Sequence, residues 1–182
     1  MSITDSQVTN KSFLSPLGFK FVIKKTPNVN YFVQSVSLPS ITLNRVDVPN
    51  PFIKIPLPGD HLDFGELTLT FKVDEDLKNY LEIYNWMIGM GFPDDFDQYK
   101  DVDLIRGGKN TGNVDRMSGG GIYSDATLSI LSSAMNVNHN VTFIDAFPTA
   151  LQELQFLTTD TDVNYLTATV SFTYRKFTIE TL

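Results

Sequence analysis

The sequence predicts a mainly β protein, built as a β barrel or sandwich with one flanking α-helix and a long loop insertion. Several runs alternate apolar and polar residues with the period of two that a strand with two different faces requires. A single stretch with helical periodicity lies between two of these runs, and most neighbouring runs are joined by short turns. This pattern is typical of a barrel or sandwich with one packed helix.

The first two strands are expected at residues 19–23 and 31–37. In the first, the apolar residues Phe19, Phe21 and Ile23 alternate with Lys20 and Val22. The proline-containing residues 26–28 should end this strand as a turn.

Residues 38–58 are predicted to form an extended arm or edge hairpin. Prolines 39, 49, 51, 56 and 58 argue against a central strand, because proline cannot donate a hydrogen bond to a neighbouring strand. The apolar residues between them are too many for a solvated loop. We favour burial of the arm against another copy of the chain over packing on its own domain. The candidate interface residues of the arm are Val46, Val48, Phe52, Ile53 and Ile55.

A strand at residues 66–73 and a helix at residues 77–90 are expected next. The strand carries Leu67, Leu69, Phe71 and Val73 on one face, and the acidic residues 74–76 favour a helix start. The predicted main apolar face of the helix comprises Leu77, Tyr80, Leu81, Tyr84, Met87 and Ile88, and the predicted polar stripe comprises Lys78, Asn79, Glu82 and Asn85. A second apolar flank belongs either to the core or to an interface with a neighbouring subunit, where Trp and Met are enriched. Its residues, also interface candidates, are Ile83, Trp86 and Met90.

Residues 91–124 are rich in glycine and aspartate and are predicted to be a long insertion. Strands are expected at 125–131 and 141–146, with a turn at 136–140 between them and a turn or short helix at 148–151. The chain then finishes with one long strand at 165–175. One face of this strand is apolar, and the other carries Thr167, Thr169, Ser171 and Thr173.

Composition limits the classes of function. The 182 residues, 42% of them hydrophobic, suffice for one domain with a real core. The absence of cysteine excludes disulfides and thiolate chemistry. A net charge of −7 argues against gripping a nucleic-acid backbone. Without a signal-peptide pattern or an apolar run of roughly 20 residues, we expect cytosolic synthesis and no membrane insertion.

The residues that could carry chemistry form no convincing site. The acidic cluster around Asp94, Asp95 and Asp97 lacks the glycine and glutamate of a calcium loop, so we interpret it as loop charges. His61 and His139 are expected in turns without a second histidine at ligand spacing. The glycine clusters match no phosphate-binding motif. We therefore expect no enzyme activity, no cofactor, no catalytic residue and no metal site.

Several short motifs resemble the tail tube proteins of contractile-tailed phages related to T4. They are Gly59-Asp60, the strand at 67–71, the acidic turn at 74–76, the helix with Trp86, and a late segment of Phe147-Pro148-Thr149, then Glu153-Leu154-Gln155 and an alternating final strand. The resemblance covers roughly residues 19–90 and 125–179. Related folds form the inner tube of type VI secretion systems.

The resemblance implies a structural virion protein, made and assembled in the cytoplasm of the bacterial host. Copies would form hexameric rings that stack into a tube inside a contractile sheath, with the sheath protein, baseplate proteins and tube-terminating proteins as partners. DNA would pass through without specific binding. Residues 44–57 correspond to an arm that reaches a neighbouring subunit or ring, and Thr167, Thr169, Ser171 and Thr173 are candidates for the lining of the passage.

Three hypotheses follow for the function. The first is the repeated tube subunit. The second is a minor component at the baseplate or the terminating end, because the insertion at 91–124 is longer than a simple tube protein requires. The third is a β-sandwich enzyme or ligand-binding protein, which would need a deep pocket with convergent polar groups.

Overall fold

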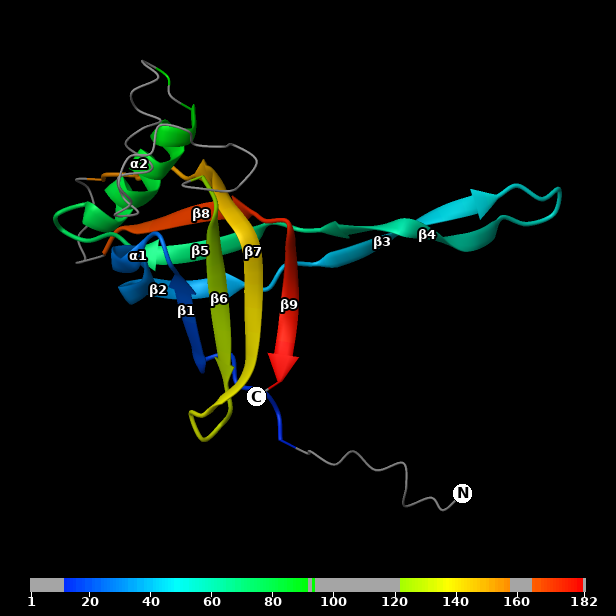
Figure 1. The fold of residues 1–182 in the computed structure, drawn as a ribbon, viewed down its shortest axis with the longest axis horizontal. Coiled ribbons are helices and arrows are strands. Elements are labelled where there is room, and N and C mark those ends of the chain that lie inside the picture. The colour runs from blue at the N-terminus through cyan, green and yellow to red at the C-terminus, as the bar shows by residue number, and fades with distance from the viewer. Residues whose placement is uncertain (1–11, 92, 94–121, 158–164, 182) are drawn as a thin grey trace, which may run out of the picture.

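The computed structural model describes residues 12–91, 93, 122–157 and 165–181 (Figure 1). The elements in chain order are β1 (Phe19–Ile23), α1 (Pro27–Tyr31), β2 (Val33–Ser37), β3 (Ile41–Val48), β4 (Ile55–Phe64), β5 (Leu67–Lys72), α2 (Lys78–Gly91), β6 (Ser124–Leu131), β7 (Val137–Leu151), β8 (Thr167–Thr173) and β9 (Lys176–Thr181). The predicted turn at 26–28 is instead the start of the short helix α1. Of the expected insertion, residues 92 and 94–121 lie outside the described residues.

Seven strands form one antiparallel sheet that folds into two layers. Their order is β1-β6-β7-β8-β5-β2, with β9 beside β7. The long β7 belongs to both layers, because its first part pairs with β6 and β9 and its last part pairs with β8. In Figure 1 the layer of β1, β6, β7 and β9 runs steeply across the layer of β2, β5 and β8. The predicted mainly β barrel or sandwich with a flanking helix is confirmed.

Both layers bury one face of each strand in a common core. In β5, Leu67, Leu69 and Phe71 are completely buried, as the alternation predicted. They face the buried Val170 and Phe172 of β8 across the strand pairing. Aromatic side chains join the second layer to this core; the rings of Phe143 and Tyr174, for example, have centroids 5.1 Å apart. Burial of one face of each strand thus explains why apolar and polar residues alternate along the sequence.

Two predictions for the end of the chain are wrong. Residues 137–151 form one bent strand, where a turn, a short strand and a second turn or helix were expected. Asp145 takes φ 56° at the bend, a conformation that Asp tolerates better than most residues. The strand predicted at 165–175 is present as β8 at 167–173, but it does not end the chain as predicted, because the chain bends near Arg175 and returns as β9. The backbone N–H of Arg175 donates to the Ile144 carbonyl at 3.0 Å, and its side chain pairs with Asp145, which holds this corner together.

Helix α2 has the predicted position but presents a different face to the core. Ile83 and Trp86 are completely buried together with Asn79, which was expected in the polar stripe. The expected core residues Leu81 and Tyr84 are 44% and 47% exposed. The cause lies at the end of β5, where the Asn79 amide donates to the Lys72 carbonyl at 2.7 Å and accepts from a backbone N–H. Because main-chain groups satisfy this buried amide, the helix turns its second apolar flank inward.

Candidate functional site

A hairpin of β3 and β4 projects from the body as a separate two-stranded sheet (Figure 1). At its base, the Gly65 N–H donates to the Ser40 carbonyl at 2.9 Å. The Tyr174 hydroxyl donates to the Gly65 carbonyl at 2.8 Å, and burial raises the pKa of this hydroxyl. The hairpin, here called the arm (residues 41–64), is therefore attached to the core through a protonated tyrosine.

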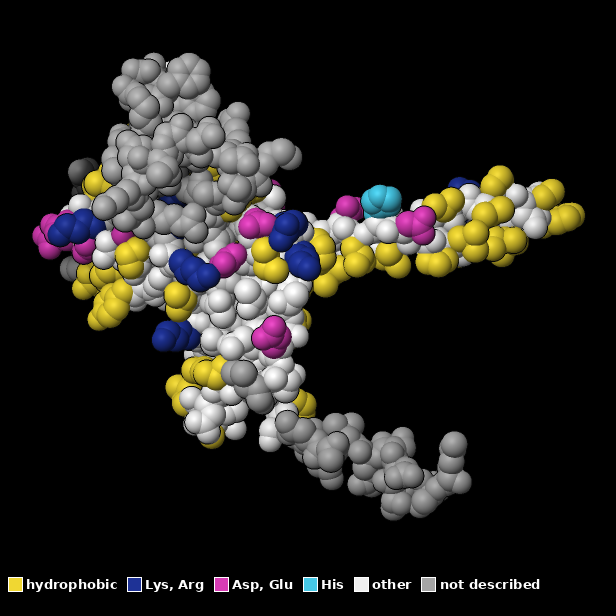
Figure 2. Space-filling view, viewed as in Figure 1, with side chains coloured by type: hydrophobic (Ala, Val, Ile, Leu, Met, Phe, Trp, Pro, Cys, Tyr) yellow, Lys and Arg dark blue, Asp and Glu magenta, His cyan; other side chains and the backbone are white. Residues whose placement is uncertain are grey.

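The arm carries much exposed apolar surface. Figure 2 shows hydrophobic side chains along its length and at its tip. The predicted interface residues in it have exposed fractions of 58% for Val46, 38% for Val48, 95% for Phe52, 68% for Ile53 and 42% for Ile55. Packing of these residues on their own domain, the less favoured alternative, is wrong. Burial against another copy stays a prediction.

The interface prediction for Ile83 and Trp86 needs correction, because both side chains lie in the protein's own core. The Trp86 indole N–H donates to the Ile122 carbonyl at 2.8 Å, and the Lys25 ammonium lies 4.8 Å from the ring centroid. Met90 is half-buried and packs against the same core. The face that α2 turns outward instead carries Leu81 and Tyr84.

Two sheet faces present hydroxyl groups outward. On the first lie Thr167, which is exposed, and the half-buried Thr169, Ser171 and Thr173. The Thr169 hydroxyl lies 3.2 Å from the hydroxyl of Thr70 in β5. Sequence reasoning missed the second face, although the same alternation marks it; its half-buried residues are Thr127, Ser129, Asn140, Thr142 and Thr178. The hydroxyl residues of β8 are therefore one of two surfaces of similar chemistry.

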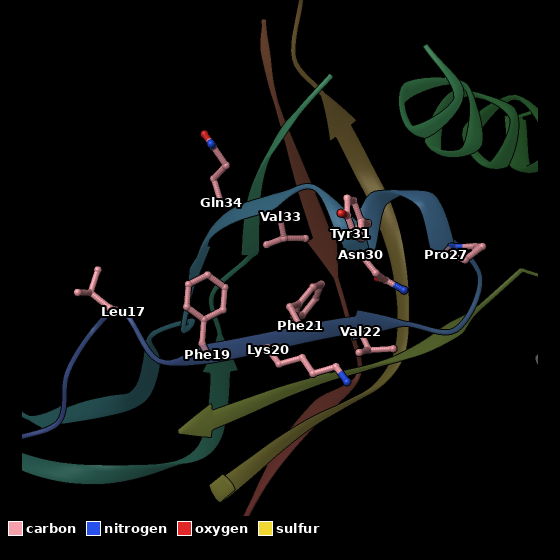
Figure 3. Close-up of a pocket in the computed structure, with 10 residues that line it drawn as sticks. All are labelled: Leu17, Phe19, Lys20, Phe21, Val22, Pro27, Asn30, Tyr31, Val33 and Gln34. Carbon is pink, nitrogen blue, oxygen red and sulfur yellow. The ribbon is translucent and has the colours of Figure 1, made fainter. Parts of the chain in front are cut away.

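A depression lies between β1 and β2, the two ends of the sheet (Figure 3). Its volume is about 570 Å³, and Phe19, Phe21 and Val33 point into it. Among the described residues that line it, Lys20 is the one charged side chain. The Asn30 side chain closes one end by hydrogen bonding both the N–H and the carbonyl of Ile23.

The predictions about metal-site residues have mixed outcomes. His61 lies in β4 and His139 in β7, so their expected placement in turns is wrong. The cluster around Asp94, Asp95 and Asp97 lies outside the described residues. Within the ranges that the structure describes, no group of three or more His, Asp or Glu residues could hold a metal ion. In those same ranges, no helix has the length and apolar character to span a membrane.

Comparison with known proteins gives a consistent result. The family described as phage tail tube protein matches residues 5–180. The tail tube terminator protein of Enterobacteria phage T4 is 27% identical over 173 residues, which cover 84% of this chain and 88% of that protein.

Two solved structures share the fold. The tube-terminating cap of the anti-feeding prophage matches with a TM-score of 0.63 and 17% identity, covering 100% of both chains. A chain of the PVC sheath–tube complex, from an extracellular contractile injection system in the extended state, matches with a TM-score of 0.60 and 15% identity. That match covers 100% of this chain and 99% of the other.

Proposed function

Because this chain belongs to the family of phage tail tube proteins, we propose that it terminates the inner tube of a contractile tail. Membership makes the chain a component of phage tails, as the sequence predicted. The observation that carries the proposal is the 27% identity with the tail tube terminator protein of phage T4, which extends over 84% of this chain. The tube-terminating cap of the anti-feeding prophage shares the fold, and at 17% identity that likeness reports the fold alone.

In this proposal the protein is a structural component and not an enzyme. Six copies form a ring that binds the last ring of tube subunits and prevents further addition. The sheath and the proteins at the tail end are the other partners. The exposed apolar arm supports such an assembly, because monomeric proteins rarely leave extended apolar surface uncovered.

The repeated tube subunit remains the second candidate. The match to the family described as phage tail tube protein is compatible with it, and a chain of the PVC sheath–tube complex shares the fold. At 15% identity this likeness reports the fold alone. The T4 relative is more similar in sequence and is named as a terminator, so termination has the stronger support.

A passage for DNA would require a lining that does not bind the polyanion. Hydroxyl side chains and net negative charge meet this requirement, because repulsion acts within a Debye length of about 8 to 10 Å. The β8 face with Thr167, Thr169, Ser171 and Thr173 is our proposed lining. Cysteines placed at Thr169 and, on the other hydroxyl face, at Thr142 test this choice. Only a thiol that lines the passage is protected from a bulky maleimide in the capped tube.

Tube growth in the presence of the purified protein tests termination. Tube subunits of the same phage are polymerised from baseplates, and gold-labelled protein is added at increasing concentration. Termination predicts tubes that become shorter as the concentration rises, with label at the end distal to the baseplate. Label distributed along tubes that keep growing would refute termination and favour the repeated subunit.

A further inference from the structure

The arm is rooted in a cluster of four aromatic rings at the corner where the chain passes from β8 to β9. Three of the rings, here called the socket, belong to Phe143 of β7, Tyr174 at the corner and Phe177 of β9. Their centroids lie 5.1, 5.7 and 6.1 Å apart. The fourth ring is that of Phe64, the last residue of β4, and its centroid lies 5.5 Å from Phe177 and 6.2 Å from Tyr174. In Figure 1 the arm leaves the body beside this corner.

Hydrogen bonds hold the root of the arm at the same place. The Tyr174 hydroxyl donates to the Gly65 carbonyl, and the Gly65 N–H donates to the Ser40 carbonyl. The two chain segments at the root lie so close that a Cβ atom on Gly65 would be 2.8 Å from the Ser40 hydroxyl oxygen. Tyr174 therefore holds two successive residues, Phe64 through its ring and Gly65 through its hydroxyl. Two contacts of different kinds on one side chain leave a projecting hairpin little freedom to swing.

The same corner joins the two layers of the body. Strand β7 bends at Asp145, and the chain bends again near Arg175 between β8 and β9. The backbone N–H and the side chain of Arg175 reach back to Ile144 and Asp145, so the two bends are tied together. Among the described strands, pairing passes from one layer to the other through β7 alone, because β1 and β2 are the two ends of the sheet. The angle between the layers is therefore set at the corner that also holds the arm.

We propose that this corner is a joint, which holds the arm at a fixed angle to the body and couples that angle to the angle between the two layers. The joint belongs to the free protein and exists whether or not the protein terminates tubes. If the arm turns, Phe64 must displace the rings of the socket, two of which lie in β7 and β9. Packed protein interiors transmit such displacements, because they contain little free volume. A force on the arm would therefore change the angle between the layers.

The length of the arm makes the direction of its root measurable. Strand β4 has 10 residues, and from the root to Ile55 it rises roughly 30 Å at about 3.3 Å per residue. A turn of about 10° at the root would move the far end by about 5 Å over that length. The described strand pairing of the arm is internal, because β3 and β4 form a sheet of their own. Its direction relative to the body therefore depends on the root.

Two pairs of spin labels report the two angles. The arm pair consists of Lys54→Cys near the tip of the arm and Ser35→Cys in β2, and the layer pair consists of Lys20→Cys in β1 and the same Ser35→Cys. All three residues are exposed, and the absence of native cysteine makes the labelling specific. Double electron–electron resonance measures the distribution of each distance. Dilution of labelled protein into excess unlabelled protein restricts the measurement to distances within one chain.

The variants act on separate parts of the joint. Tyr174→Phe removes the hydrogen bond to the arm and keeps all four rings, and Phe64→Leu removes the ring of the arm from the socket. Asp145→Gly loosens the corner from outside the arm, because glycine adopts a positive φ freely and cannot pair with Arg175. Met135→Gly is the matched control, since it introduces glycine at another residue of positive φ, in the turn between β6 and β7.

We expect a single narrow arm distribution in the wild type and at least twice that width in Tyr174→Phe and Phe64→Leu. Asp145→Gly should at least double the width of both distributions, although the substitution lies in β7. Met135→Gly should match the wild type in both. Melting curves establish that each variant is folded. Tyr174→Phe carries the test of the root if Phe64→Leu does not fold, and Arg175→Gln, which removes the same ion pair, replaces Asp145→Gly if that variant does not fold.

Three results would overturn the joint. A broad arm distribution in the wild type would show that the arm has no fixed angle. Unchanged arm width in both Tyr174→Phe and Phe64→Leu would show that its direction is set elsewhere. A change in Asp145→Gly that is confined to the layer pair would refute the coupling. Tubes take no part in these measurements, so failure of the protein to terminate tubes would leave the outcome for the joint unaffected.

Discussion

Replacing Phe52 and Ile53 by aspartate is expected to abolish tube capping while leaving the monomer folded. Both residues lie at the tip of the arm, where they are 95% and 68% exposed. Burying a large apolar side chain completely contributes about 1.5–3 kcal/mol. Nearly all of this contribution for Phe52, and about two thirds for Ile53, is still available to a partner.

The two side chains together can therefore contribute about 2.5–5 kcal/mol per subunit to binding. At 1.4 kcal/mol for each factor of ten, their loss weakens each contact by roughly sixtyfold to a few thousandfold. The isolated monomer loses no buried surface, and exposed substitutions usually change stability by less than about 0.5 kcal/mol. For two substitutions this is at most about 1 kcal/mol, so its melting temperature should fall by no more than about 4 °C.

The assay is the length distribution of tubes grown from baseplates with wild-type or variant protein, together with the melting curve of each monomer. Lys54→Asp is the matched control, because it changes the charge of the same turn by the same amount and removes no exposed apolar side chain. We expect this control to cap tubes. A double variant that caps like the wild type, or whose monomer unfolds, would refute the reasoning.

Four further changes distinguish the core from the surface. Trp86→Ala should destabilise the monomer by about 3–5 kcal/mol, because it leaves a cavity at a fully buried site. An unchanged melting temperature with impaired assembly would show instead that Trp86 contacts a neighbouring subunit. Asn79→Ala should cost about 2–3 kcal/mol in chemical denaturation, since the Lys72 carbonyl loses its buried partner. Tyr174→Phe should cost about 1–2 kcal/mol and speed hydrogen exchange of the Gly65 amide, whereas slow exchange there would show that the hydroxyl does not hold the arm. Raising the salt from 0.05 M to 0.5 M should strengthen self-association, measured by sedimentation, because it screens repulsion between copies of net charge −7; weakening would indicate contacts made by ion pairs.

The strands were predictable where one face of a strand is buried. In β5 and β8 the apolar residues occupy alternate positions, and every one of them enters the core. Strand β9 carried the same signal, with Phe177 and Ile179 alternating against Lys176 and Thr178. It was missed because nothing in the local pattern marks the bend at Arg175, which depends on Asp145 in a distant strand.

The face of α2 could not be predicted from hydrophobicity. The sequence offers two apolar flanks; the larger one was taken as the main apolar face, and the smaller one was left open between the core and an interface. The choice depends on Asn79, whose amide finds main-chain partners only where β5 ends. A buried polar residue that is satisfied by another element cannot be distinguished from a surface residue in one sequence.

For the arm, the sequence predicted the type of element correctly but not its detailed strand register. Its prolines predicted an edge hairpin correctly, because in a two-stranded ribbon each strand has a free side where a missing donor costs nothing. Pro56 and Pro58 indeed lie in β4, opposite Asp47 and Arg45. The register shift between Leu43 and Arg45 was not predictable, because it depends on the close approach of Gly59 to the Asn44 carbonyl.

The charge of the chain explains why assembly should depend on the arm. Identical copies of net charge −7 repel one another, and this repulsion opposes assembly. Apolar contacts can offset it, and the arm presents exposed apolar surface for such contacts. The core of the body depends little on the arm, because Phe64 is the one residue of the arm (residues 41–64) that packs against it. Substitutions in the arm should therefore act on assembly and leave folding intact, while substitutions at Asn79 or Trp86 should act on folding first.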